Sequence, residues 1–129
     1  MSGAPAPAAR RVATAPVRAR HWSEPRVRRW LEARGWRSLA ENVRYRHGEL
    51  DLVMREGDTI VFVEVRQRRS DRHGGAAASL DPRKHARVRR AAATWLAERG
   101  LHEAAVRFDA ALVTGEIAAA RVVLVRDAF

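Results

Sequence analysis

Four charged residues lie in two short, otherwise apolar runs of the chain. Glu49 and Asp51 alternate with leucines in the first run, and Glu64 and Arg66 flank a valine in the second. Because successive side chains of a β-strand point to opposite faces, each pair would share one face of its strand. Clustered carboxylates repel one another, and such clusters persist when a cation neutralises them or one acid stays protonated. Oxygen-only ligands select hard cations, so these residues predict a site for Mg²⁺ or Mn²⁺.

A β-hairpin would bring the two runs together. The segments Leu50 to Met54 and Ile60 to Val65 are rich in aliphatic residues, and the five residues between them include Gly57. Glycine adopts a positive φ at little cost, as tight hairpin turns require. The pattern therefore predicts two antiparallel strands joined by a short turn.

The register of this hairpin decides which side chains meet. A pairing that gathers Leu50, Leu52 and Met54 with the valines of the second strand leaves the four charged residues together on the reverse face. With the turn centred between residues 56 and 57, Glu64 would lie opposite Glu49. The alternative is a solvated face whose acids pair with some of the many arginines.

The hairpin must be held by the elements around it. A first helix is predicted from Ser23, as the N-cap, to a stop at Gly35, and a second from Asp81, as the N-cap of Pro82, to Gly100. Further strands are predicted over 36–45, 106–113 and 121–125, and a loop over 67–80. The fold class expected is α/β, a central mixed β-sheet flanked by helices in α-β-β-β-α-β-β order.

Composition separates a leader from a single domain. Residues 1–20 are rich in Ala, Pro and Arg and contain no acid, which predicts a disordered leader, whereas residues 21–129 can form one modest core. The chain has no cysteine and hence no thiolate metal site. No apolar run reaches the roughly 18 to 20 residues of a membrane helix. We therefore expect no membrane partner and a cytoplasmic location.

The chain is strongly basic. It has 25 Lys and Arg against 15 Asp and Glu, a formal net charge of +10, and Lys84 is its one lysine. Such a surplus favours a nucleic-acid partner, with DNA the leading candidate. Arg68, Arg69 and Arg72 follow the acidic run, and we expect them to contact phosphates without reading sequence. A basic protein-interaction domain is a further alternative.

Two segments carry a resemblance to a known family. Gly48 to Val53 and Asp58 to Arg66 resemble the signature of the YraN-like family, uncharacterised protein family 0102, which is assigned to the PD-(D/E)XK, or restriction-endonuclease-like, superfamily. The resemblance runs from about Ser23 to Phe129. It includes Asn42, Arg44, Lys84, Arg107 to Asp109, and Asp127 to Phe129. It implies an endonuclease-like core for residues 21–129.

The resemblance assigns roles to individual residues. Asp51 matches the metal-binding aspartate of the superfamily, and Glu64 matches the acid of its second half-motif. Glu24 stands where resolvase-like nucleases place a helix glutamate near the metal. The two carboxylates and the Val65 carbonyl would hold Mg²⁺, which polarises the phosphate and supplies a hydroxide nucleophile. Together with the hairpin face, the predicted metal ligands are Asp51, Glu64, Glu24 and Glu49.

Two residues depart from the family pattern. Ser23 replaces the glycine usual before Glu24, and Arg66 replaces the lysine that ends the half-motif. That lysine can orient or help deprotonate the attacking water, whereas arginine stays protonated. Either the site is catalytically weak or dead and the domain only binds nucleic acid, or a coding bias has replaced lysine by arginine and another group covers the role. Lys84 is the candidate for that group, so the predicted catalytic residues are Asp51, Glu64, Arg66 and Lys84.

These observations lead to one function and two alternatives. The leading expectation is a metal-dependent nuclease-like protein that hydrolyses phosphodiester bonds in DNA, with branched or structured sites suggested by the resolvase-like resemblance. The first alternative is a non-catalytic nucleic-acid-binding module on a nuclease scaffold. The second is the basic protein-interaction domain. Divalent-metal binding would distinguish the nuclease from both alternatives. Salt-sensitive nucleic-acid binding would distinguish the protein-interaction domain from the nuclease and the nucleic-acid-binding module.

Overall fold

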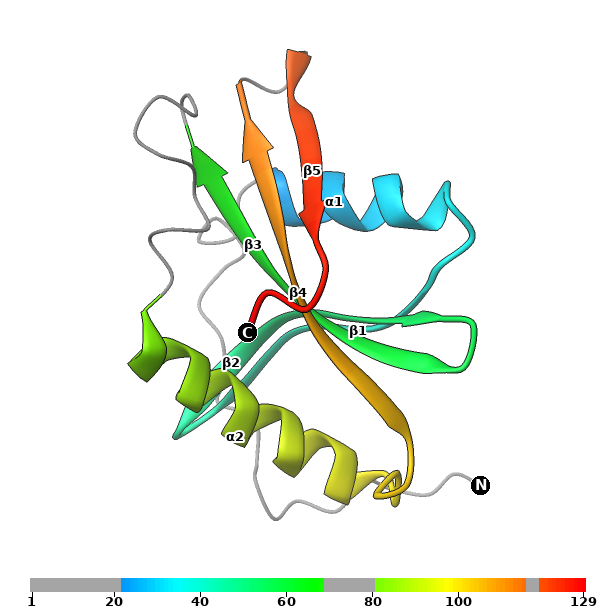
Figure 1. Cartoon of the computed structure of the whole chain (residues 1–129), viewed down its shortest axis with the longest axis vertical. Helices are drawn as coiled ribbons and strands as arrows, with labels where there is room; N and C mark the ends of the chain where they lie inside the picture. Colours follow the sequence, from blue (N-terminus) through cyan, green and yellow to red (C-terminus); the bar gives the residue numbers. More distant parts are fainter. Residues whose placement is uncertain (1–21, 69–80, 116–118) are drawn as a thin grey trace.

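The structure is a computed structural model, and it describes residues 22–68, 81–115 and 119–129 (Figure 1). The predicted leader over 1–20 lies outside the described residues, as does most of the predicted loop. Residues 67 and 68, which we placed in that loop, belong to a strand instead. The elements are α1 (Ser23–Glu32), β1 (Arg37–Tyr45), β2 (Gly48–Glu56), β3 (Thr59–Arg68), α2 (Pro82–Glu98), β4 (Ala105–Thr114) and β5 (Arg121–Val125).

The strands form one mixed sheet. Its order is β1-β2-β3-β4-β5, and all neighbours are antiparallel except β3 and β4, which are parallel. A parallel pair needs a long crossover, and α2 lies in the connection between these two strands. The predicted fold class and element order are therefore confirmed.

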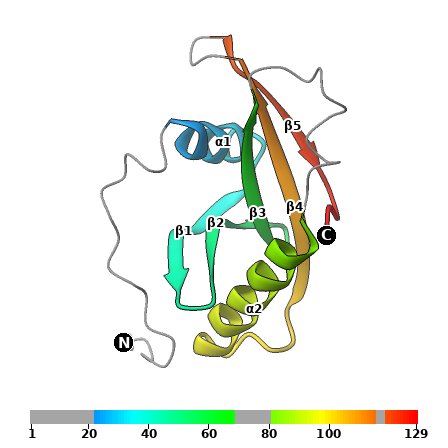
Figure 2. The same ribbon diagram turned by 90° about the vertical axis from the view of Figure 1, so that its left-hand side faces the viewer.

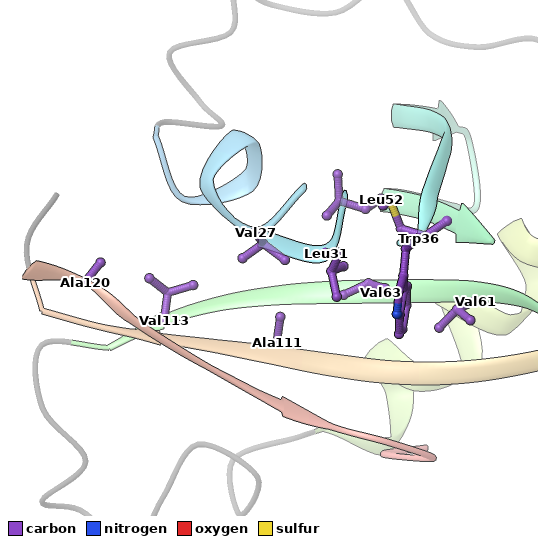
Figure 3. Close-up of a cluster of buried hydrophobic side chains, with 10 residues drawn as sticks. Val27, Leu31, Trp36, Leu52, Val61, Val63, Ala111, Val113 and Ala120 are labelled. Carbon is purple, nitrogen blue, oxygen red and sulfur yellow. The ribbon is translucent and has the colours of Figure 1, made fainter. Parts of the chain in front are cut away.

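The two helices cover opposite faces of the sheet. Val27 and Leu31 of α1 pack on a cluster that includes Leu52 and Val63 (Figure 3). Trp95 of α2 packs on the other face, in a cluster that includes the side chains of Val53, Ile60 and Phe62. Alternation along β2 and β3 thus supplies both layers of the core. Within the described residues, no helix is long and apolar enough to cross a bilayer.

The helix starts differ from each other. Asp81 caps α2 as predicted, because its carboxylate accepts a hydrogen bond from the Arg83 N–H at 2.9 Å. The prediction that Ser23 caps α1 was wrong. Ser23 is the first helical residue and is buried, and Trp22 stands at the cap position without a side-chain bond. Burial turns the Ser23 side chain into the protein, away from the cap role.

The hairpin register differs from the predicted one. Glu56 pairs with Thr59 and Leu52 pairs with Val63, so the turn is Gly57-Asp58. Continued by one pair, this register sets Asp51, not Glu49, opposite Glu64. Gly57 has a φ of +59°, and a positive φ confined to the first turn residue is the pattern of type II′ hairpin turns. Because Gly57 is the first turn residue, the turn is centred between residues 57 and 58, and the strand pairing differs from the predicted one.

The face assigned to Leu50 was also wrong. Leu50 packs in the cluster beneath α2, whereas Leu52 packs in the cluster beneath α1. The strand thus changes face at Asp51. In β1, Asn42 lies between the residues paired with Leu52 and Leu50, and it has a φ of +52°. Asparagine tolerates this left-handed conformation, which interrupts the alternation.

The same bend separates β2 from β3. Pairing between these strands ends at Leu52 and Val63, whereas β1 and β2 remain paired as far as Tyr45 and Gly48. Figure 1 shows β1 and β2 curving away together from β3 towards α2. Gly48 lies so close to the helix that a Cβ there would be 2.5 Å from the carbonyl oxygen of Arg87. A wedge thus opens between β2 and β3 beside α2.

Candidate active site

A small pocket with acids and apolar side chains in its walls lies in the wedge between the two diverging strands. Glu49 and Asp51 line it from β2, Glu64 lines it from β3, and Lys84 and Val88 line it from α2. The bend in β2 therefore determines which side chains meet at this pocket. It gathers three acids and the single lysine of the chain around one space.

Asp51 is held where the ladder opens. Its Oδ2 accepts a hydrogen bond from the backbone N–H of Val65 at 2.9 Å. Continued beyond Leu52 and Val63, the register would set Leu50 opposite Val65, but the strands have separated there. The carboxylate of Asp51 thus takes the place of a strand partner for Val65, which fixes its position at the mouth of the wedge.

Glu64 is a buried acid between two cations. Only 4% of the residue is exposed. Its Oε2 lies 2.7 Å from Nζ of Lys84, and its Oε1 lies 3.6 Å from Nη2 of Arg66. A buried carboxylate needs such partners because removing an isolated charge from water is costly. The crossover through α2 brings Lys84 to Glu64 from twenty positions along the chain.

The predicted catalytic residues therefore lie together. Glu64, Arg66 and Lys84 are in contact, and Asp51 lines the same pocket. The lysine side chain is 42% exposed, whereas that of Arg66 is 15% exposed. Lys84 can thus leave Glu64 for solvent or a ligand more easily than Arg66 can.

The other two predicted metal ligands are placed differently. Glu49 lines the pocket and forms an ion pair with Arg44 at 3.2 Å. Glu24 is buried on α1, the helix that covers the face of the sheet opposite α2, and is not among the residues that line the pocket. Across the described ranges, no three His, Asp or Glu side chains are grouped as a ready metal cluster.

The donor atoms of the pocket nevertheless fit a hard cation. Asp51 and Glu64 both line this pocket and carry carboxylate oxygens, and Glu64 is buried. Mg²⁺ often takes only one or two carboxylates from a protein and keeps several waters. A pair of acids is thus sufficient for such a site, with the waters and a phosphate completing the coordination.

Of the three predicted phosphate-contact residues, Arg68 lies within the described structure. Arg68 is the last residue of β3, where it pairs with Thr114. Arg69 and Arg72 lie outside the described residues. Their proposed contact with phosphates therefore stays a prediction.

His85 of α2 is a further neighbour of Glu64. Its ring is half-buried and stacks on the ring of Phe129, with centroids 4.2 Å apart. Burial lowers the pKa of His85, while the charge of Glu64 acts in the opposite direction. The lowered pKa favours the neutral ring of His85. The only sequence signal for this contact was the closing phenylalanine.

A second buried acid lies on the α1 face. Asp109 is fully buried, and its carboxylate accepts hydrogen bonds from Arg107 and from the backbone N–H of Asp127. Arg107 and Arg126 both donate to Glu56. The hydrogen bonds that Arg107 donates to Asp109, first, and to Glu56 raise the pKa of Arg107, so its guanidinium stays charged. This network fastens the end of the chain to β4.

Comparison with known sequences gives a family match. Residues 23–113 match the family described as "Uncharacterised protein family UPF0102". The chain is 55% identical over 91 residues to UPF0102 proteins of Yersinia pseudotuberculosis and Yersinia pestis. Each of these alignments covers 69% of this chain and 78% of the relative. The family match includes the pocket acids, Lys84 and Asp109.

Proposed function

Because the chain belongs to the uncharacterised protein family UPF0102, whose name states no activity, we propose its function from the pocket itself. The proposal is a metal-dependent nuclease of the PD-(D/E)XK type that hydrolyses phosphodiester bonds in DNA. The observation that carries it is the 2.7 Å contact between Nζ of Lys84 and the buried carboxylate of Glu64, beside Asp51.

Asp51 and Glu64 are the proposed ligands of Mg²⁺ or Mn²⁺. When bound, such a cation would polarise a phosphoryl oxygen and stabilise the charge that develops during hydrolysis. The Val65 N–H holds Asp51 in place, and burial restricts the rotamers of Glu64. Pre-positioned ligands of this kind lose little entropy when they take up a cation.

Lys84 has the role that the half-motif lysine would fill. Its ammonium approaches Glu64 from α2, whereas Arg66 approaches the other carboxylate oxygen from β3. A compact ammonium with three donors can orient a water for attack on phosphorus and neutralise charge on the phosphate. The planar guanidinium of Arg66 stays protonated and can only stabilise charge. The division of labour is thus a positioning lysine and an electrostatic arginine.

A non-catalytic nucleic-acid-binding module is the second candidate. The observation that favours it is that Glu64 already faces two cations, Lys84 and Arg66, which can neutralise it without a metal. In such a protein the pocket would be a structural remnant. DNA binding would then rest on the basic surface alone.

A cleavage assay separates the two candidates. The wild type, Asp51→Asn, Lys84→Ala and Arg66→Lys would be incubated with linear, single-stranded and branched DNA in Mg²⁺ or Mn²⁺. Arg90→Ala, an exposed arginine on the same helix as Lys84, is the matched control. We expect cleavage by the wild type and the control, none by Asp51→Asn, and a loss of roughly 10² to 10³ in rate for Lys84→Ala.

Other outcomes redirect the proposal. A wild type that binds DNA in a salt-sensitive way but cleaves none of the substrates is the result expected of the binding module, and cleavage gained by Arg66→Lys would then mark a decayed nuclease. Undiminished cleavage by Lys84→Ala would remove Lys84 from the account. A protein that neither binds nor cleaves DNA would leave the basic protein-interaction domain.

A further inference from the structure

A larger groove adjoins the pocket on the side of Lys84. It lies between the turn that joins β1 to β2 and the first half of α2, elements that lie beside each other in Figure 2. Glu49, Lys84 and Val88 line both spaces. The groove therefore leads directly to the acids of the proposed active site.

The charges of the groove are mostly positive. Arg44, Arg46, Lys84 and Arg87 line it, against the single acid Glu49. Glu49 is already paired with Arg44 at 3.2 Å, and Lys84 is paired with Glu64. Arg46 and Arg87 are exposed, and no carboxylate in the described part of the chain pairs with either guanidinium. These two arginines thus present uncompensated charge, one from each wall of the groove.

The two walls are fixed to each other. Tyr45 donates a hydrogen bond to Glu98 at 2.7 Å, and the ring of His47 lies 3.1 Å from the hydroxyl of Thr94. Gly48 leaves no room for a side chain against the backbone of Arg87. The spacing between the two arginine-bearing walls is therefore set before any ligand arrives, which lowers the entropic cost of binding.

We propose that this groove binds the phosphate backbone of the nucleic-acid strand that leads into the pocket, with Arg46 and Arg87 contacting successive phosphates. The inference rests on the proposed function for its direction, since the groove ends at the residues assigned to phosphodiester hydrolysis. A polyanion that carries its charges on a backbone suits a positive channel that reads no sequence. An acidic peptide is the alternative occupant, and the test includes it.

The test is DNA binding by a groove variant and a matched control. Anisotropy of a fluorescein-labelled DNA oligonucleotide, single-stranded and annealed, would be measured across a range of salt without divalent cation. Arg46→Ala/Arg87→Ala removes the two groove charges. Arg37→Ala/Arg90→Ala removes two exposed charges, one from β1 and one from α2, that do not line the groove. Polyglutamate serves as a competitor.

We expect the groove variant to bind about tenfold more weakly at 0.1 M salt. Its plot of log affinity against log salt should be less steep by roughly 1.4 on single strands, because each lost phosphate contact removes about 0.7 from the slope. The control should stay within about threefold of wild type. The proposed role of the groove would be overturned if both variants lost affinity equally, or if the groove variant lost none. It would also be overturned if the wild type did not bind DNA, or if polyglutamate of equal charge displaced the DNA.

The groove and the nuclease can fail separately. Asp51→Asn is expected to bind DNA like wild type in this assay, since it leaves both arginines in place, while losing cleavage. If no variant cleaves and the groove variant still loses affinity, the groove stands and the proposed activity falls. If wild type cleaves and the groove variant binds and cleaves normally, the activity stands and the groove falls.

Discussion

Asp109 and Glu64 are both buried acids that face arginine, but they lie on opposite faces of the sheet and have different surroundings. Asp109 lies on the α1 side, where the guanidinium of Arg107 extends over the ring of Trp36. Glu64 lies on the α2 side, in contact with Lys84. A buried carboxylate beside an arginine thus occurs twice in this domain.

The bonding of the two acids differs. Asp109 accepts from Nε and Nη2 of Arg107 and from a backbone N–H of the closing segment, and none of it is exposed. Glu64 contacts two side-chain cations and receives no hydrogen bond from the described backbone, and it borders a pocket. An acid whose bonds are complete holds the chain together. An acid that borders a pocket and is paired with a partly exposed cation can exchange that cation for a ligand.

The largest expected effect separates these two roles by stability. Asp109→Asn should lower the free energy of unfolding by about 3 to 5 kcal/mol, because it leaves the buried guanidinium of Arg107 without its main counter-charge. Glu64→Gln should cost less, about 1 to 3 kcal/mol, because Lys84 can turn to solvent and only the more distant Arg66 is left without its counter-charge. Urea unfolding of both variants measures the difference. Equal losses would show that Glu64 is as structural as Asp109.

A glycine comparison tests the α2 side alone. Gly48→Ala should lower the unfolding free energy by about 1 to 3 kcal/mol, because the new Cβ meets the Arg87 carbonyl and forces the turn away from α2. Gly57→Ala has open space around it and pays only for its positive φ, about 1 to 2 kcal/mol. DNA affinity should fall in the first variant and hold in the second. The same affinity in both would mean that the groove spacing is unimportant.

The smallest expected effect concerns pH and the Asp109 side. The hydrogen bonds of Arg126, and then those of Arg107, lower the pKa of Glu56 below 4.5. A carboxylate whose pKa is depressed on folding stabilises the protein above its unfolded pKa, and this contribution is lost as pH falls through the folded value. Between about pH 7 and pH 3, Glu56→Gln should therefore lose less stability than wild type, by under about 1 kcal/mol. Thermal unfolding at the two pH values would show it, and parallel losses would contradict it.

The sequence predicted the elements better than their register. Alternation and the Asp81 cap gave the strands and α2, because these signals are local. The sheet face on which Leu50 packs depends on the positive φ of Asn42 in the neighbouring strand. The pairing of β2 with β3 depends on the position of Gly57 in the turn between them. Neither is encoded in hydrophobic pattern. The approach of Lys84 to Glu64 depends on the crossover, so the residues alone predicted no contact, and only the family resemblance placed them near each other.

The central claim is that Asp51 and Glu64 form a cation site while Asp109 does not. Mn²⁺ titration followed by electron paramagnetic resonance measures free metal directly, and needs neither substrate nor turnover. We predict saturable binding by wild type and its loss in Asp51→Asn/Glu64→Gln. An exposed-acid control, Glu41→Gln/Glu103→Gln, removes the same charge and should bind like wild type. Equal affinity in wild type and in the Asp51 and Glu64 variant would contradict the account.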